Sequence, residues 1–206
     1  MANLFVSPRG KSVIMCVHSD DVDMVCEDPQ DGVLITDAFN TKFGGDKDGI
    51  KMCDPKFMLG VQRTIKRDEE TGTTYLELTQ KGCIIDLYEE FKDMVPKRKV
   101  STPMPASTFL SMFNPDSTRR VQPDELTKEI KAKGYMSIVG TLLWLSRNCF
   151  PEISQGVSQL CAVMSMPSQE ALNAALHMVA YVYDQRDRGI RFSSDGNRDL
   201  LTLYDA

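Results

Sequence analysis

The chain has 206 residues, 42% of them hydrophobic, and a formal net charge of −5. This length allows one large domain or two small ones, and the apolar content excludes a chain that is disordered by composition. No run approaches the ~18 apolar residues of a membrane-spanning helix, and the acidic total argues weakly against nucleic-acid binding.

The charge is unevenly distributed along the chain. Residues 20–31 contain six acids and no base, whereas residues 92–133 contain nine bases and five acids. The N-terminal stretch MANLFVSPRGKSV lacks the pattern of a secretory signal. The six cysteines include no C-x-x-C pair and only two histidines accompany them, so we expect no zinc site of the usual kinds.

The first predicted element is a β-hairpin. Val13–Val17 and Val22–Cys26 are short β-prone runs split by the letters HSDD. A helix is expected next, with Asp28 as its cap, Pro29 in its first turn, and an apolar stripe that ends at Phe43.

A second hairpin is predicted with Lys56–Arg67 against Thr73–Thr79 around the turn EETG. A helix follows, because apolar residues from Cys83 to Met94 recur on one helical face. The five prolines of residues 95–123 then indicate a linker or long loop.

Four helical patterns follow this loop, and their short links suggest an antiparallel bundle. Pro151 and Ser168 are predicted starts of the last two helices. We expect the apolar stripes, including Trp144, Met164 and Met166, to be core, and His177 to be a packed or partly exposed helix residue rather than a base. The final residues, from GIRFS onward, are β-prone again.

The adjacent acids Asp20 and Asp21 at the hairpin tip are the most informative polar pair. Aspartates are common as solvated turn residues, which is one interpretation. A tight turn can also project two carboxylates toward one region, where a cation must neutralise their repulsion. Mg²⁺ is the natural candidate, because it binds one or two carboxylates together with substrate phosphates.

The hairpin resembles the aromatic-x-Asp-Asp signature of the reverse-transcriptase palm, and the motifs downstream resemble those of copia-type long-terminal-repeat retrotransposons. The order and spacing agree over roughly residues 11–206. The residues that carry this resemblance after the hairpin are Phe57-Met58-Leu59-Gly60, Gln80, Thr102-Pro103, Tyr135, Gly140, Leu142 to Leu145, Pro151-Glu152-Ile153, Pro167, Ala174, Ala175, Val179 and Tyr181.

The resemblance implies an α+β fold in four segments. Residues 11–94 would be a partial reverse-transcriptase palm of antiparallel hairpins and helices, and residues 95–123 a Pro-rich loop or linker. Residues 124–186 would be a helical thumb or connection region, and residues 187–206 the truncated start of an RNase H-like domain.

The resemblance also implies roles for individual residues. Asp20 and Asp21 would be catalytic and would bind Mg²⁺ or Mn²⁺ in the complete enzyme, and Asp205 matches the first RNase H metal ligand. The expected nucleic-acid contacts are His18, Phe57, Leu59, Gly60, Lys97, Arg98 and Lys99. The implied partners are a template–primer of RNA or DNA, a deoxynucleotide and the rest of the Pol polyprotein, in the cytoplasm within a virus-like particle and also in the nucleus, with no membrane and no secretion.

Two features separate this chain from the family pattern. His18 stands where the family usually has tyrosine, and only twelve residues precede Val13. We therefore expect the fingers and the third metal-binding aspartate to be missing, and this chain alone not to polymerise DNA. The alternatives are a non-catalytic relic or co-opted binding module, and an unrelated transferase that uses Asp21 and Asp23.

Overall fold

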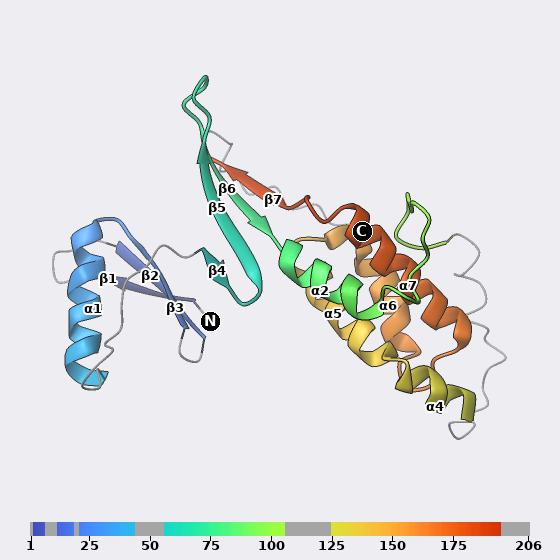
Figure 1. Ribbon diagram of the computed structural model, residues 1–206. Helices are drawn as coiled ribbons and strands as arrows, with labels where there is room; N and C mark the ends of the chain where they lie inside the picture. The colour runs from blue at the N-terminus through green and yellow to red at the C-terminus, as the bar shows by residue number, and fades with distance from the viewer. Residues whose placement is uncertain (1, 7–11, 19–20, 44–55, 106–124, 195–206) are drawn as a thin grey trace, which may run out of the picture. The chain divides into compact units, whose positions relative to one another are not determined.

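The computed structural model describes residues 2–6, 12–18, 21–43, 56–105 and 125–194; residues 2–6, 12, 18 and 21 are described through their backbone alone. The fold is α+β, with six α-helices and two small antiparallel sheets in these ranges (Figure 1). The chain divides into two compact units, Met1–Met58 and Leu59–Ala206. Within the described ranges, no helix combines the length and apolar character needed to cross a bilayer.

The first unit is a three-stranded meander with one helix. Strands β1 (Ala2–Val6), β2 (Ser12–His18) and β3 (Asp21–Cys26) pair in the order β1-β2-β3, and helix α1 (Pro29–Phe43) packs against β3. The Asp28 carboxylate accepts a hydrogen bond from the Gln30 backbone N–H at 2.9 Å. The predicted hairpin and the predicted helix start are thus confirmed.

The second unit begins with a sheet. The two-residue strand β4 (Phe57–Met58) closes the first unit, and in the second unit β5 (Val61–Arg67) forms a hairpin with β6 (Thr74–Thr79). The Asp68 carboxylate accepts hydrogen bonds from two backbone N–H groups of the connecting turn and so stabilises it. The last described strand, β7 (Ile190–Ser193), pairs with β6.

The prediction of one continuous strand over Lys56–Arg67 is wrong. The backbone of Leu59 has φ 50° and that of Gly60 has φ 76°, a left-handed conformation that an extended strand does not contain. These two residues therefore separate β4 from β5.

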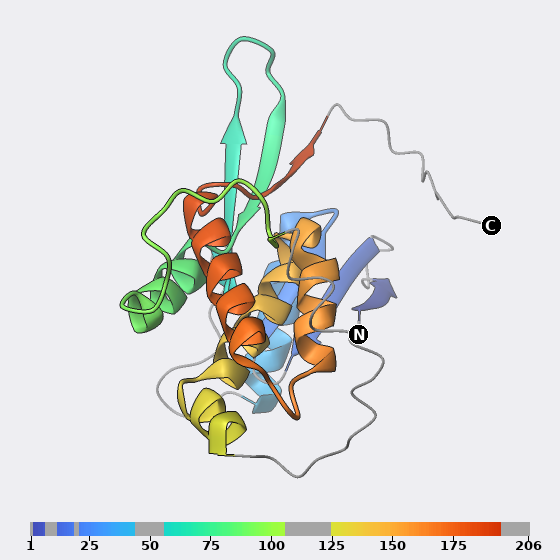
Figure 2. The same ribbon diagram turned by 90° about the vertical axis from the view of Figure 1, so that its right-hand side faces the viewer.

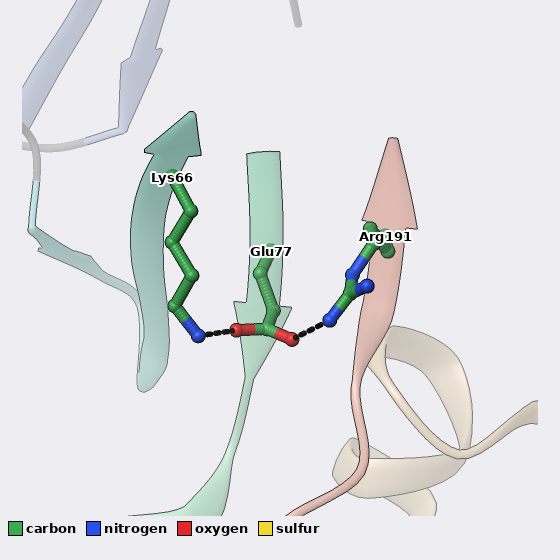
Figure 3. Close-up of polar contacts among 3 residues, drawn as sticks. All are labelled: Lys66, Glu77 and Arg191. Carbon is green, nitrogen blue, oxygen red and sulfur yellow. Dashed lines mark hydrogen bonds and ion pairs between the residues drawn. The ribbon is translucent and has the colours of Figure 1, made fainter. Parts of the chain in front are cut away.

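Charged side chains join the three strands of this sheet (Figure 3). Glu77 on β6 accepts from Lys66 Nζ on β5 at 2.6 Å and from Arg191 Nη2 on β7 at 3.1 Å. The two cations hold the pKa of the Glu77 carboxyl below its usual value, the Lys66 hydrogen bond contributing most. Glu77 thus links strand β7, which follows the helices, to the β5–β6 hairpin.

Helices make up the rest of the second unit, packed together as Figure 2 shows. They are α2 (Lys81–Phe91), α4 (Glu125–Ala132), α5 (Tyr135–Asn148), the 3₁₀ turn η1 (Pro151–Ile153), α6 (Ser154–Ala162) and α7 (Gln169–Asp184). The starts at Pro151 and Ser168 are confirmed, and the Ser168 hydroxyl accepts from the Ala171 N–H at 3.1 Å. Their shared core includes Ile84, Leu87, Ile130, Ile138, Leu142, Leu145, Val157, Leu160, Leu172 and Val179.

Helix α7 is the centre of this core, because it packs against α2, α5 and α6. Eleven of its residues, from Ala171 to Val182, are buried. His177 is among them, at 8% exposure, as expected of a packed helix residue. Trp144 and Met166, predicted to be core, are instead 39% and 40% exposed; nothing within the described part of their unit covers them fully.

The division between Met58 and Leu59 falls inside the predicted 11–94 segment. Strand β7 joins the sheet of β5 and β6, although the resemblance implied that residues 187–206 begin another domain. The four-segment division stays a prediction, since residues 106–124 and 195–206 lie outside the described residues.

Candidate functional site

The β2–β3 hairpin carries the predicted metal ligands. In its register His18 pairs with Asp21, so residues 19 and 20 alone connect the strands. Asp20 lies outside the described residues, and Asp21 and His18 are placed by their backbone. Asp21 therefore begins β3 directly after the connection.

The two faces of this hairpin differ in burial. Val13 and Met15 are buried at 0% and 6% exposure, whereas Ile14 and Val25, which pair across the strands on the other face, are 48% and 64% exposed. Side chains alternate between faces along a strand, so register position 21 falls on the face of Ile14 and Val25. Nearer the connection this contrast is lost, because Val17 and Val22 on the other face are 46% and 42% exposed, while Cys16 and Asp23 on the face of position 21 are half-buried.

The acidic character of the hairpin continues at its far end. Burial raises the pKa of the Cys26 thiol, and the nearby Asp31 and Asp28 carboxylates raise it further. A thiol with a raised pKa stays protonated and is a poor metal ligand. The nearby carboxylates thus favour the neutral thiol at Cys26 over the thiolate.

A hard cation such as Mg²⁺ fits the donor chemistry of the Asp20–Asp21 pair, because both residues supply carboxylate oxygens. Among the residues whose side chains are described, no three His, Cys, Asp or Glu side chains group as a metal site. Asp20, Asp21 and Asp205 are not among those residues.

The predicted nucleic-acid contacts Phe57, Leu59 and Gly60 flank the unit boundary. Phe57 lies one residue before the end of the first unit at 69% exposure, and Leu59 begins the second unit at 39%. Gly60 follows with its positive φ, and a Cβ built there would be 3.4 Å from Trp144 Nε1. The Leu59–Gly60 turn therefore lies against the exposed indole of α5.

One face of α5 is open beyond this turn. Met136, Gly140 and Trp144 recur every four residues, the two large ones are 53% and 39% exposed, and nothing lies within 4 Å of a Cβ built at Gly140. We call Leu59, Gly60, Met136, Gly140 and Trp144 the α5 surface. The sequence signal was present, since the stripe has helical spacing, but the same spacing also fits core residues.

Lys97, Arg98 and Lys99 lie in the segment that follows α2, and all three are exposed. None of them makes a salt bridge with another described residue. Val95 and Val100, on either side of them, are buried at 4% exposure each. The structure thus brings the three bases together on a segment that is packed down at both sides.

The chain is similar in sequence to two transposon proteins. It is 30% identical over 203 residues to the retrovirus-related Pol polyprotein from transposon RE1 of Arabidopsis thaliana, and 29% identical over 203 residues to that from transposon RE2 of the same plant. Each match covers 98% of this chain but 12% of the relative. No family model and no solved structure matches. The similarity supports a retrotransposon Pol region, of which the chain spans a small part.

Proposed function

We propose that the chain is part of the RNA-directed DNA polymerase of a copia-type retrotransposon. The observation that carries the proposal is the hairpin register, in which His18 pairs with Asp21 and leaves Asp20 in the two-residue connection. The similarity to two transposon Pol polyproteins over 98% of the chain supports the same proposal.

Asp20 and Asp21 would hold Mg²⁺ or Mn²⁺, together with a third carboxylate that we expect from another part of the polyprotein. When bound, such metals stabilise charge on the attacking and leaving oxygens of a phosphoryl transfer. In this proposal the two carboxylates come from the β2–β3 hairpin, whose strands pair as far as His18 and Asp21.

The α5 surface is the proposed contact for the template–primer duplex. Gly140 has no side chain, so a sugar–phosphate backbone or base-pair edge can come close to the helix there. Leu59 and Trp144 border that position with exposed apolar area. Phe57, at 69% exposure, is assigned the same role from the end of the first unit.

A chimaera tests the proposal. The 203 matched residues of the RE1 Pol polyprotein are replaced by this chain, and primer extension on a poly(rA)–oligo(dT) substrate is measured with Mg²⁺. We expect extension by the chimaera, loss of it with Asp20→Asn or Asp21→Asn, and near-normal extension with the matched control Asp23→Asn. The 206-residue chain by itself should give no extension.

Three results would contradict the proposal in different ways. A folded chimaera that does not extend primers, beside an active RE1 parent, would favour a non-catalytic module. Equal losses for Asp21→Asn and Asp23→Asn, together with nucleotide-sugar binding, would favour a different transferase. Extension by the chain alone that Asp20→Asn abolishes would show that no further carboxylate is needed.

A further inference from the structure

The segment that follows α2 is anchored along α7. The Asp184 carboxylate accepts a hydrogen bond from the Val100 backbone N–H at 3.1 Å. Seven residues earlier on the same helix, the His177 ring nitrogen Nε2 lies 2.9 Å from the Thr102 carbonyl oxygen. Since a carbonyl oxygen only accepts, His177 Nε2 carries the hydrogen and donates it.

Apolar contacts extend this attachment in both directions. Val95 and Val100 are buried at 4% exposure. At the far side, a Cβ built at Gly156 of α6 would be 2.7 Å from Met104 Cγ, so Met104 packs directly on the glycine. Figure 2 shows the segment, in yellow-green, crossing α7 from α2 toward α6. We call residues 95–104 the strap.

The charged residues of the strap lie between two buried valines that limit where the segment can move. Lys97, Arg98 and Lys99 lie between the buried Val95 and Val100 and are all exposed. The sequence favoured a linker here, and a flexible linker would have to lose conformational freedom before it could hold three charges against a ligand. Attachment to α7 removes most of that cost in advance.

We propose that the strap is a preformed phosphate-binding surface for a nucleic-acid duplex, and that His177 and Asp184 are its positioning residues. The partner class rests on the proposed function, whereas the attachment to α7 does not. Asp184 has two opposing effects in this arrangement. Its carboxylate holds the strap in place, but its negative charge weakens the attraction of the neighbouring cations for phosphate.

These opposing effects make substitutions at Asp184 decisive. Asp184→Asn keeps an oxygen that can accept from the Val100 N–H and removes the charge, so the 206-residue chain should bind an RNA–DNA duplex at least as tightly as the parent. Asp184→Ala removes both, and we expect it to bind about threefold to tenfold more weakly than Asp184→Asn. Electrostatics alone would make the two variants equal, and equal affinities would overturn the positioning role.

His177 offers a second pair. His177→Gln keeps a side-chain donor for the Thr102 carbonyl, and His177→Ala does not, so glutamine should rescue binding and alanine should not. Hydrogen exchange of the Val100 amide reports the attachment itself, with fast exchange expected in Asp184→Ala and slow exchange in Asp184→Asn. Equal exchange rates in the two Asp184 variants would also overturn the attachment.

The salt dependence of binding counts the phosphate contacts. Replacing Lys97, Arg98 and Lys99 together by alanine should reduce the slope of log K against log salt by about 2 to 3, because each cation that neutralises a phosphate contributes about 0.9. The control Lys128→Ala, on α4 and paired with Glu125, should leave the slope unchanged. An unchanged slope in the triple variant, or equal displacement by polyglutamate, would overturn the phosphate-binding role.

Failure of this inference and failure of the polymerase proposal are distinguishable. Binding is measured on the chain without any primer extension. If the chimaera is inactive but the Asp184 and His177 variant pairs behave as expected, the inference about the strap is supported and the polymerase proposal is not. If the chimaera extends primers but the chain binds no duplex even at low salt, the strap is overturned and the polymerase proposal stands.

Discussion

The side-chain oxygen of Gln80 accepts a hydrogen bond from the backbone N–H of Cys149 at 3.1 Å. Gln80 precedes the first residue of α2 and Cys149 follows the last residue of α5, so one amide joins the ends of two helices. The Cys149 thiol also donates to the Leu78 carbonyl at 3.4 Å. The hairpin strand β6 is therefore fixed to the helical core at the point where it leads into α2.

Substitutions at Gln80 should separate its hydrogen bond from its bulk. The side chain is 1% exposed, and its Nε2 has no hydrogen-bond partner among the described residues. Gln80→Met fills the same space and also removes this costly buried group, so we expect a change in unfolding free energy below about 1 kcal/mol. Gln80→Ala leaves a cavity and should cost about 2 kcal/mol.

Gln80→Glu is the sharpest comparison, because it keeps the accepting oxygen but buries a charge without a cation. We expect it to be the least stable of the three in urea unfolding at neutral pH. A Gln80→Glu variant as stable as the parent would show that water reaches this position.

Two glycines of the second unit should respond to alanine with opposite signs. Gly134 has φ 88°, and a Cβ there would lie 2.6 Å from Phe91 Cε1. Gly134→Ala should therefore lower the unfolding free energy by about 2 kcal/mol or more. Gly140 lies in the middle of α5 with open space around it, so Gly140→Ala should raise that free energy by about 0.5–1 kcal/mol. Thermal unfolding of both variants checks the pair.

Much of the local structure could be predicted from neighbouring residues. A few adjacent residues predict the Asp28–Pro29 start of α1 and the Ser168 cap of α7. The apolar stripe of α7 predicts that it is a core helix. Such signals depend on contacts within one turn or one helical face.

The remaining features depend on residues far apart in the chain. Gln80 and Cys149 are hydrogen-bonded although 69 residues separate them in the chain, and no local sequence pattern predicts that contact. Trp144 shows a second limit of sequence-based prediction. Periodicity assigns it to the apolar face of a helix, but it does not predict whether another element covers that face. Leu59 adopts a positive φ, which is rare for a residue with a bulky side chain. Gly60 beside it was a signal for an interruption of the strand, but nothing in the sequence indicated that the interruption begins at the leucine.

The pH dependence of stability should include a contribution from Glu77. Its pKa is lowered by Lys66 and then by Arg191, so the ionised form is favoured in the folded state. The stabilisation is fully present above the ordinary carboxyl value of 4.5 and is lost as the pH falls through the lowered folded value. Both cations are more than half exposed, so solvent screening limits the contribution at neutral pH to less than about 1 kcal/mol.

Urea unfolding of Glu77→Gln and the parent between about pH 7 and pH 3 checks this contribution. The parent should be more stable at neutral pH, and the difference should shrink as the pH falls. Glu69→Gln, in the exposed turn of the same hairpin, should show no such difference. A Glu77→Gln deficit that stays constant down to pH 3 would mean that shape rather than charge joins the strands.

At Gly140, fold stability and duplex binding on the α5 surface should respond to the same substitution in opposite directions. If the duplex approaches α5 at Gly140, the added methyl of Gly140→Ala blocks that approach while it stabilises the helix. We expect duplex affinity to fall by about 1 kcal/mol, or roughly fivefold, in a variant that melts at a higher temperature. Gly82→Ala in α2 is the matched control, because its Cβ also meets nothing within 4 Å and it lies outside the α5 surface.

Fluorescence anisotropy of a labelled RNA–DNA duplex, measured beside thermal melts of both variants, gives the two quantities together. Weaker binding in a more stable protein cannot come from partial unfolding, so this pattern would assign Gly140 to the contact surface. Full affinity in Gly140→Ala would show that the duplex does not approach α5 at this position. The contact would then have to be sought at the strap, which the Asp184 and His177 variants address independently.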